Sequence, residues 1–349
     1  MSTNIAVAPK PQKPWRPTPR ALVPTYLGIL ATIFGVWFLI EFTGLAGKLG
    51  AFVSAVFLTT LISSLIAYLQ RGKQAAKNAA VASIITSGAL LAVFPVISIL
   101  GTVFVRGVKG IYVGFFINDM GLASVNDPLN VGGILHAIVG TALMIVIATL
   151  VSVPLGISTA IYLTEIKGPG TRLIRFLVQA MSGVPSIVAG LFIYSALISG
   201  SGRGFNGLFG ALALAILMLP TVARTAEEVL LLIAQDLREA GLALGATQWR
   251  TVAMVVVPAA KSGLITAVIL GVARIAGETA PLLFTTGGGD VTNLNPVNGV
   301  MGSIPFAIWK ALISGSEESN ARAWASILVL LVLVMILFFS ARRLGKARR

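Results

Sequence analysis

Long apolar runs constrain this chain more than any other feature of its sequence. Eight runs carry almost no charge and approach or exceed the roughly 20 residues that a helix needs to cross the hydrocarbon core of a bilayer. Hydrophobic residues make up 56% of the chain and charged residues only 11%, which excludes a water-soluble fold. The sequence therefore predicts an all-α, polytopic membrane protein with spans at 21–42, 49–69, 79–105, 134–163, 173–198, 207–222, 262–284 and 323–340.

Prolines in the third, fourth and fifth of these runs are expected to affect helix geometry. Pro95, Pro154 and Pro185 lie inside the third, fourth and fifth runs. Because proline removes a backbone donor and clashes with the preceding turn, we expect the three helices to bend there. The run at 207–222 is short for a complete crossing.

Basic residues give the predicted orientation. The chain has 26 Lys and Arg against 12 Asp and Glu, a formal net charge of +14. Most of the basic residues lie between or beside the apolar runs, and they gather on one side when the N-terminus is placed in the cytoplasm. The positive-inside rule then predicts that both termini are cytoplasmic. Membrane topology explains the net charge, so lipid is expected as a partner and nucleic acid is not.

Three polar segments stand out between the runs. Residues 1–20 are rich in Pro and basic residues, which is typical of a disordered cytoplasmic tail. Residues 223–261 form the longest predicted cytoplasmic loop. Residues 285–322, on the opposite side, are rich in Gly and Asn and contain an amphipathic stretch at 304–313, which predicts a loop that folds back on the outer mouth.

Several kinds of chemistry are excluded by composition. The chain has no cysteine, so it has no disulfide, no thiolate nucleophile and no Cys-ligated metal. His136 is the only histidine, and its place at the start of an apolar run indicates a packing or capping role. We therefore predict no metal, no cofactor and no catalytic residue.

Ionisable residues inside the runs are candidates for function, because burying them in a membrane is costly. Arg274 and Glu278 are four residues apart and are expected on one face of one helix. They form either an internal ion pair or part of a substrate path. Thr279 and Pro281 favour the path, since a proline frees backbone groups that should line a cavity. Arg224, at the inner end of another run, is either a second pathway residue or a membrane anchor.

Two arginines on one path suit an oxyanion. A guanidinium keeps its charge and offers a fork of donors that matches two oxygens. A nearby acid would keep binding weak enough for release. Arg224, Arg274, Glu278 and Thr279 are therefore the predicted pathway residues.

Residues 223–261 carry the strongest motif. The pattern predicts an amphipathic helix, a break at Gly241 and Gly245, and a second short helix that Pro258 ends. A stiff helix-turn-helix elbow of this kind suits insertion into a groove of a soluble partner.

The spacing in this segment resembles the EAA loop of permease subunits of bacterial ABC importers. Glu239, Ala240, Gly245 and Pro258 fall at the fixed positions of that loop, and Gly241 stands where the family more often has Ala. The resemblance implies that these five residues couple the chain to an ATPase subunit.

Flanking segments narrow the resemblance. ARTAEEVLLL (223–232), GVPSIVAGLFIY (183–194) and ARIAGETAPLLFT (273–285) are similar to the permease subunit of the phosphate-specific ABC importer, the PstA type. The similarity covers roughly 79–345 and implies a six-helix permease core there. Two further predicted spans at 21–70 depart from the family and are expected to form an accessory N-terminal transmembrane hairpin. The resemblance also implies phosphate transport in the bacterial plasma (inner) membrane, with Arg224 and Arg274 essential.

Three kinds of partner follow. The chain has no G-x-x-x-x-G-K-[ST] loop for ATP phosphates, so hydrolysis is expected on a separate ATPase dimer and this chain is expected not to be an enzyme. It has no soluble domain large enough to capture solute, so an extracytoplasmic phosphate-binding protein is expected. The family further implies a homologous second permease subunit.

Alternative functions remain at this stage. Sulfate, molybdate and phosphonate permeases share the EAA loop. A stand-alone secondary anion transporter or channel would explain Arg274 but not that loop. A lipid phosphotransferase would need a cluster of His or acids at the membrane interface, where the sequence offers His136 and Glu165.

Overall fold

The computed structural model describes residues 19–42 and 48–345. Most of the predicted tail at 1–20 therefore lies outside the described residues. Within them the chain is helical, and the only extended pairing is an isolated bridge between Gly287 and Met301. The chain divides into two compact units, residues 1–100 and 101–349.

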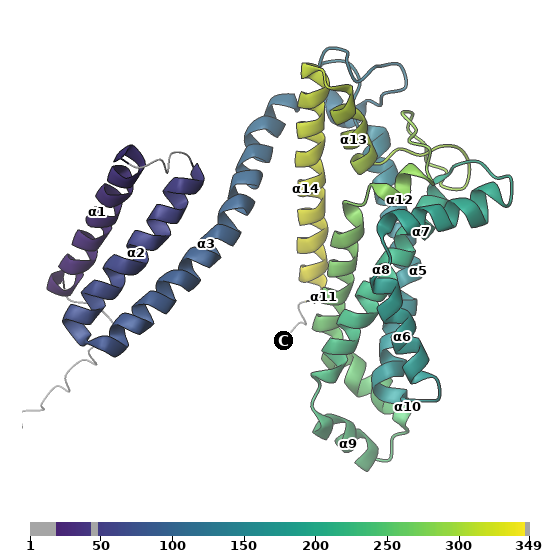
Figure 1. The fold of residues 1–349 in the computed structure, drawn as a ribbon. Helices are drawn as coiled ribbons and strands as arrows, with labels where there is room; N and C mark the ends of the chain where they lie inside the picture. The colour runs from purple at the N-terminus through teal and green to yellow at the C-terminus, as the bar shows by residue number, and fades with distance from the viewer. Residues whose placement is uncertain (1–18, 43–47, 346–349) are drawn as a thin grey trace, which may run out of the picture. The chain divides into compact units, whose positions relative to one another are not determined.

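The first unit is a hairpin followed by part of a long helix (Figure 1). It contains α1 (Pro19–Phe42), α2 (Lys48–Arg71) and most of α3 (Lys73–Gly107), whose last turns belong to the second unit. Gly28 and Gly35 let α1 and α2 approach closely, because a Cβ at Gly28 would lie 2.8 Å from Ile66 and one at Gly35 would lie 2.9 Å from Leu58. Small residues at such contacts are typical of helix packing in membranes.

The second unit contains the remaining helices. Its longest members are α5 (Leu135–Ile161), α8 (Gly207–Leu231), α11 (Val257–Ala276) and α14 (Glu317–Gly345). The shorter elements are η1 (Val108–Gly110), α4 (Val113–Ile117), α6 (Thr171–Ser182), α7 (Ser186–Ile193), α9 (Gln235–Ala243), α10 (Gln248–Thr251), α12 (Ala280–Leu283), α13 (Ile304–Ser314) and the π-helical segments Tyr162–Ile166, Tyr194–Ser199 and Val252–Val256.

Helix α8 lies at the centre of this unit. In an apolar 18-residue stretch of each span, 67% of the stretch is buried for α8, compared with 33% for the span of α5, 33% for that of α11 and 22% for that of α14. Leu214, Leu217, Met218 and Val222 of α8 form the main core cluster together with residues of α5 and α11. Helix α8 therefore packs against several other helices of the unit.

The described helices match most of the predicted spans. Six are long and apolar enough to cross a membrane: Gly50–Arg71, Lys73–Gly110, Leu135–Ile166, Gly207–Leu231, Gln248–Ala276 and Glu317–Ser340. A seventh crossing is reached if the bent pair Thr171–Ser182 and Ser186–Ser199 counts as one span. The apolar part of α1, Tyr26–Glu41, is shorter than these.

The prolines act differently from one another. Helices α3 and α5 continue through Pro95 and Pro154. The predicted fifth span, 173–198, is not one straight helix, because α6 and α7 meet at 103° around Pro185. Proline lacks a donor and disfavours helical backbone in the residue before it, so the Gly-Val-Pro sequence ends α6.

The end of the unit opposite α9 and α10 is built from the 286–303 loop, α13 and the ends of α5 and α14 (Figure 1). The predicted amphipathic stretch at 304–313 forms α13, which packs against α14 and α5. Gly302 approaches Gly140 and His136 so closely that a side chain at either glycine would collide. His136 is buried with 3% of its surface exposed, in agreement with a packing role.

A carboxylate ties two loops together at this end. Asp119 accepts hydrogen bonds from the backbone N–H of Thr292 at 2.9 Å and from that of Gly121 at 3.1 Å. These donors stabilise the ionised form and lower the pKa of Asp119 below its ordinary value. The 118–133 loop is therefore fastened to the 286–303 loop, although they are far apart in the sequence.

Candidate functional site

Arg274 and Arg224 lie on the adjoining helices α11 and α8. Nη1 of Arg274 donates a hydrogen bond to Oγ1 of Thr221 at 3.2 Å. Arg224 follows Thr221 by three residues on α8, so the two side chains share a face of that helix. The structure thus associates the two predicted pathway arginines with one stretch of the central helix.

The prediction that Arg274 and Glu278 share one face of a helix is wrong. Helix α11 ends at Ala276, and Gly277 caps it, so Glu278 lies in the break before α12. Within the described residues, Arg274 and Glu278 form no ion pair. The internal ion pair considered from the sequence is absent from this conformation because the helix that would align the two side chains stops between them.

The break at 277–279 follows from Pro281, as the sequence indicated. Thr279 accepts the backbone N–H groups of Leu282 at 3.1 Å and Leu283 at 3.2 Å and so starts α12. Helix α12 packs against α7, where a Cβ at Gly190 would lie 2.6 Å from Cα of Pro281. Helices α7 and α12 each follow a break in a predicted span. They contact each other close in sequence to Glu278 and Thr279.

The predicted pathway residues form one cluster, and the predicted coupling residues form a second one at the end of the unit that contains α9 and α10 (Figure 1). Gly245 turns the chain between the two helices with φ of +79°, a conformation that glycine adopts without strain. Leu244, 90% exposed, and Trp249, 64% exposed, lie on either side of the turn. Glu239 and Ala240 on α9 are also exposed. The elbow predicted from the motif is present, with an apolar tip that nothing in the described chain covers.

The boundaries of the elbow differ from the prediction. Helix α8 runs to Leu231, so the first break falls at 232–234. Gly241 is inside α9, where a Cβ would lie 2.7 Å from Cγ2 of Thr251. Pro258 does not end a helix, because α10, the π-helical segment Val252–Val256 and α11 follow one another without a break and the span Gln248–Ala276 continues through it. Gly241 is thus a packing residue and Gly245 is the turn.

Arg238 and Glu165 form a buried link that the sequence did not reveal. Nη2 and Nε of Arg238 donate to the two carboxylate oxygens of Glu165 at 2.7 and 2.9 Å. Arg238 also donates to the carbonyls of Leu230 at 2.9 Å and Ile233 at 2.6 Å, at the end of α8. Gln248 of α10 donates to the carbonyl oxygen of Glu165. These bonds join both elbow helices to the ends of α5 and α8.

The electrostatics of this link are favourable. The carboxylate of Glu165 is 4% exposed and the side chain of Arg238 is 17% exposed. The hydrogen bonds that Arg238 donates to Glu165 raise the pKa of Arg238 above its ordinary value, so the guanidinium stays ionised. A bidentate arginine–carboxylate pair has a fixed geometry. The elbow is therefore held rigidly under the membrane helices.

No described residues gather into a metal site, since three or more His, Cys, Asp or Glu side chains nowhere come together in them. The two clusters and the helices between them define a multi-pass membrane protein with two arginines on its adjoining helices α8 and α11 and an exposed elbow at one end.

Comparison with known proteins gives the family. Residues 152–349 match the family described as "Binding-protein-dependent transport system inner membrane component". The chain belongs to this family. It is 38% identical over 246 residues to the phosphate transport system permease protein PstA of Pasteurella multocida, covering 70% of this chain and 85% of that one. It is 38% identical over 263 residues to the PstA protein of Mycobacterium leprae, covering 74% and 86%.

A solved structure shares the fold. The chain superposes on a structure of the MetNI methionine ABC transporter, described as inward facing, with a TM-score of 0.50 and 18% identity, covering 61% of this chain and 93% of that one. The predicted all-α permease core is confirmed. At this identity the likeness concerns the fold alone.

Proposed function

We propose that this chain is a permease subunit of an ATP-driven importer of inorganic phosphate. The observation that carries the proposal is the pair of arginines on α8 and α11, neither of which has a carboxylate partner among the described residues. Uncompensated cations within membrane spans are costly. An oxyanion that passes between the helices would supply the missing negative charge. The similarity to phosphate transport permeases of other bacteria supports phosphate as that anion.

The elbow supports ATP coupling through a partner. Its exposed tip around Leu244 and Trp249 offers apolar area to a groove in an ATPase subunit. Glu239, Ala240 and Gly245 would line the contact, while Gly241 and Pro258 shape it from within. We place this end in the cytoplasm, together with both chain termini, in the bacterial inner membrane. An ATPase dimer, a homologous second permease and an extracytoplasmic phosphate-binding protein complete the proposed complex, and this chain performs no catalysis.

Uptake by the purified complex in vesicles tests this function. Phosphate should enter only when ATP, the ATPase and the binding protein are all present. Excess sulfate, molybdate or phosphonate should not compete. Uptake by this chain alone would contradict the proposal in favour of a secondary transporter, and competition by another oxyanion would identify that anion as the substrate.

Gly245→Asp is expected to abolish ATP-coupled uptake while the complex still inserts in the membrane. No atom of the described chain lies within 4 Å of a Cβ at Gly245, so the side chain itself has room. The left-handed backbone costs an L-residue about 1–2 kcal/mol, and the carboxylate would be buried against the ATPase. Gly245→Ala is the matched control, because it adds only the backbone strain and should retain most of the uptake. Equal loss in both variants would place the defect in the turn and not in the contact.

The first 70 residues are proposed to be an accessory hairpin outside the path. The described basic residues of α1 and α2 are Arg20, Lys48 and Arg71, which all lie at the ends of these helices. Deleting residues 1–70 should lower the amount of assembled complex without changing which anion is carried. Uptake normalised to the complex in the membrane measures this, and a changed anion preference would contradict it.

A further inference from the structure

Three arginines from three helices lie along α8. Arg274 of α11 donates to Thr221, Arg224 lies three residues further along, and Arg175 of α6 pairs with Glu227 after three more. Residues three apart are neighbours on a helix, so positions 221, 224 and 227 follow a ridge that winds around α8 by about 60° per step and advances about 9 Å in all along the axis. The arginines thus form a winding row along α8 that runs towards the elbow.

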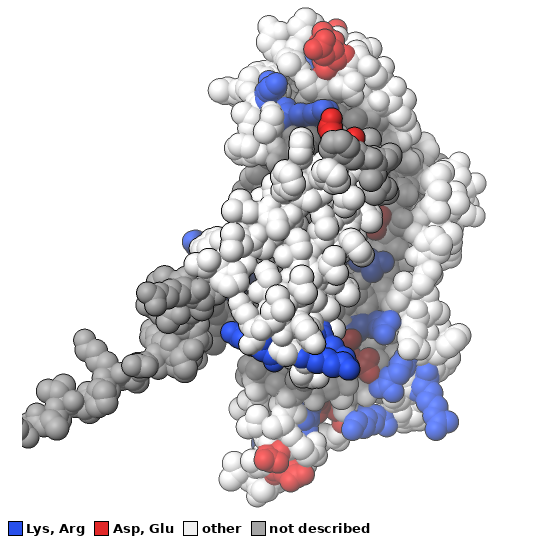
Figure 2. All heavy atoms as spheres, turned by 60° about the vertical axis from the view of Figure 1, so that its left-hand side comes forward, with Lys and Arg blue, Asp and Glu red and all other residues white. Residues whose placement is uncertain are grey.

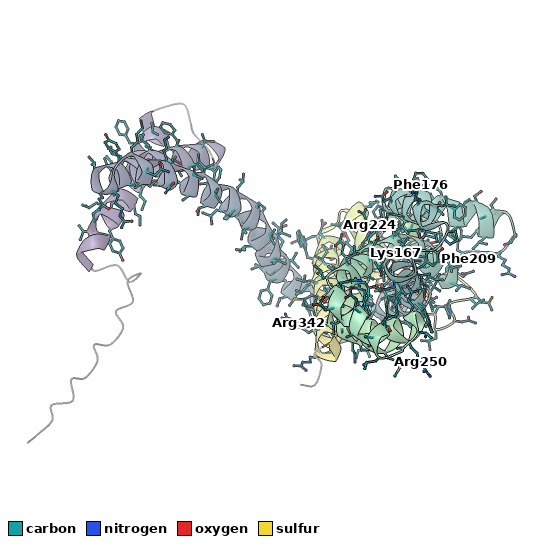
Figure 3. The ribbon with its side chains drawn as sticks, turned by 90° about the horizontal axis from the view of Figure 1, so that it is seen from below. Lys167, Phe176, Phe209, Arg224, Arg250 and Arg342 are labelled. Atoms are coloured by element: carbon teal, nitrogen blue, oxygen red, sulfur yellow. The ribbon has the colours of Figure 1, made fainter. Side chains whose placement is uncertain are left out.

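The row continues into a basic pocket. A cavity of about 530 Å³ is lined by Lys167, Arg172 and Arg175 at the start of α6, and its described lining includes no acid. In Figure 3, which views the unit from the elbow end, Lys167 and Arg224 lie close together in projection, whereas Arg250 and Arg342 lie elsewhere. Figure 2 shows Lys and Arg side chains gathered in the lower half of the molecule, with a few acids among them. The pocket therefore shares Arg175 with the ion pair at Glu227, which lies three residues from Arg224 on α8.

Glu227 is the acid that occupies the row. Its Oε1 accepts both Nη2 and Nε of Arg175, at 2.8 and 3.2 Å. The side chain of Arg175 is 49% exposed and that of Glu227 is 14% exposed. An ion pair with this much water contact is weak, about 0–1 kcal/mol. An oxyanion with two or three oxygens can displace the carboxylate, because guanidinium binds both kinds of group in the same geometry.

We propose that Lys167, Arg172 and Arg175 form an exit site for the transported anion, and that Glu227 competes with the anion for Arg175. The inference rests on the proposed function, which supplies the anion and the direction of transport. Glu227 returns to Arg175 as the anion departs and so prevents the basic pocket from retaining it. Arg175 contacts the anion, and Glu227 is a positioning residue that sets how tightly the anion is held.

Inhibition by phosphate on the cytoplasmic side tests this assignment. The whole complex is placed in vesicles that contain ATP and increasing phosphate, and uptake of labelled phosphate from outside is measured. Glu227→Gln frees Arg175, so we expect inhibition at an about tenfold lower internal concentration, the effect of roughly one charge-assisted hydrogen bond. Arg175→Gln should have the opposite effect. The double variant Arg175→Gln/Glu227→Gln should behave as Arg175→Gln does.

The double variant distinguishes an exit site from a structural ion pair. If the pair only joins α6 to α8, removing both charges should restore wild-type inhibition, and this result would overturn the proposal. Arg342→Gln is the matched control, since it removes an exposed cation near the same end and should leave the inhibition unchanged.

Two further outcomes separate the possible failures. Anionic lipid headgroups present the same phosphate chemistry, so the vesicles are made with and without phosphatidylglycerol. Internal inhibition that is equal in all variants, with uptake that follows the lipid content, would assign the pocket to lipid and overturn the proposal. Wild-type complex that carries no phosphate would overturn the proposed function as well, whereas wild-type uptake with unaltered inhibition in the variants would overturn only the exit site.

Discussion

Arg238→Ala should reduce ATP-coupled uptake by at least tenfold, although residue 238 need not touch either substrate or ATPase. The change removes the bidentate pair with Glu165 and the bonds to the last carbonyls of α8. It leaves the carboxylate of Glu165, 4% exposed, without its counter-charge. Loss of one partner of a buried pair costs about 3–5 kcal/mol. The elbow would then move independently of α5 and α8, and movement of the ATPase would not reach the path.

Uptake, pull-down of the ATPase and thermal unfolding of the complex, measured together, check this expectation. We expect the ATPase to be retained, because the exposed tip at Leu244 and Trp249 is unchanged. Arg238→Lys should recover little, since an ammonium cannot make the forked contact. Glu165→Gln should be milder, because an amide oxygen still accepts one bond. Normal uptake in Arg238→Ala would show that the elbow transmits motion without this link.

The sequence predicted the elements better than the contacts between them. The apolar runs, the break before Pro281 and the elbow at Gly245 were evident because each depends on residues close together in the chain. Glu165 and Arg238 are 73 positions apart, and nothing local marks them as partners. The one available signal was Glu165 itself, an acid at the end of an apolar run.

Helix ends were the least predictable feature. The expected face shared by Arg274 and Glu278 assumed that α11 continues to Pro281, but a proline lacks the backbone N–H and its ring clashes with the carbonyl four residues earlier, so α11 ends at Ala276 and Pro281 lies in the first turn of α12. The opposite error occurred at Pro258, which was expected to end a helix, whereas the helical span Gln248–Ala276 continues through it. Spacing alone does not distinguish a proline in a first turn from a proline that interrupts a helix. Tertiary contacts decide between the two, and a single sequence does not contain them.

Arg274 is expected to be the residue least tolerant of change in the path. Its guanidinium is held by Thr221 and by no acid in the described chain. If it binds the anion, Arg274→Gln should lower uptake by about 100-fold, since charged hydrogen bonds contribute about 1.5–3 kcal/mol and a site charge is lost as well. Arg274→Lys should fail nearly as badly, because a point charge on a flexible stem cannot present two aligned donors to the anion.

The double change Arg274→Gln with Glu278→Gln separates the two roles of this arginine. An arginine that served only to neutralise Glu278 in another conformation would be replaceable by Lys, and the double change would restore uptake. The break at 277–279 argues against that role, since it removes the helical alignment that such a pair needs. Thr221→Val provides an independent measurement, because it keeps the charge but removes the hydroxyl that orients it, and should cost about tenfold. Uptake at matched membrane levels, with Arg342→Gln as the charge control, compares the four variants. Near-normal transport by the Lys variant or rescue by the double change would remove Arg274 from the substrate path.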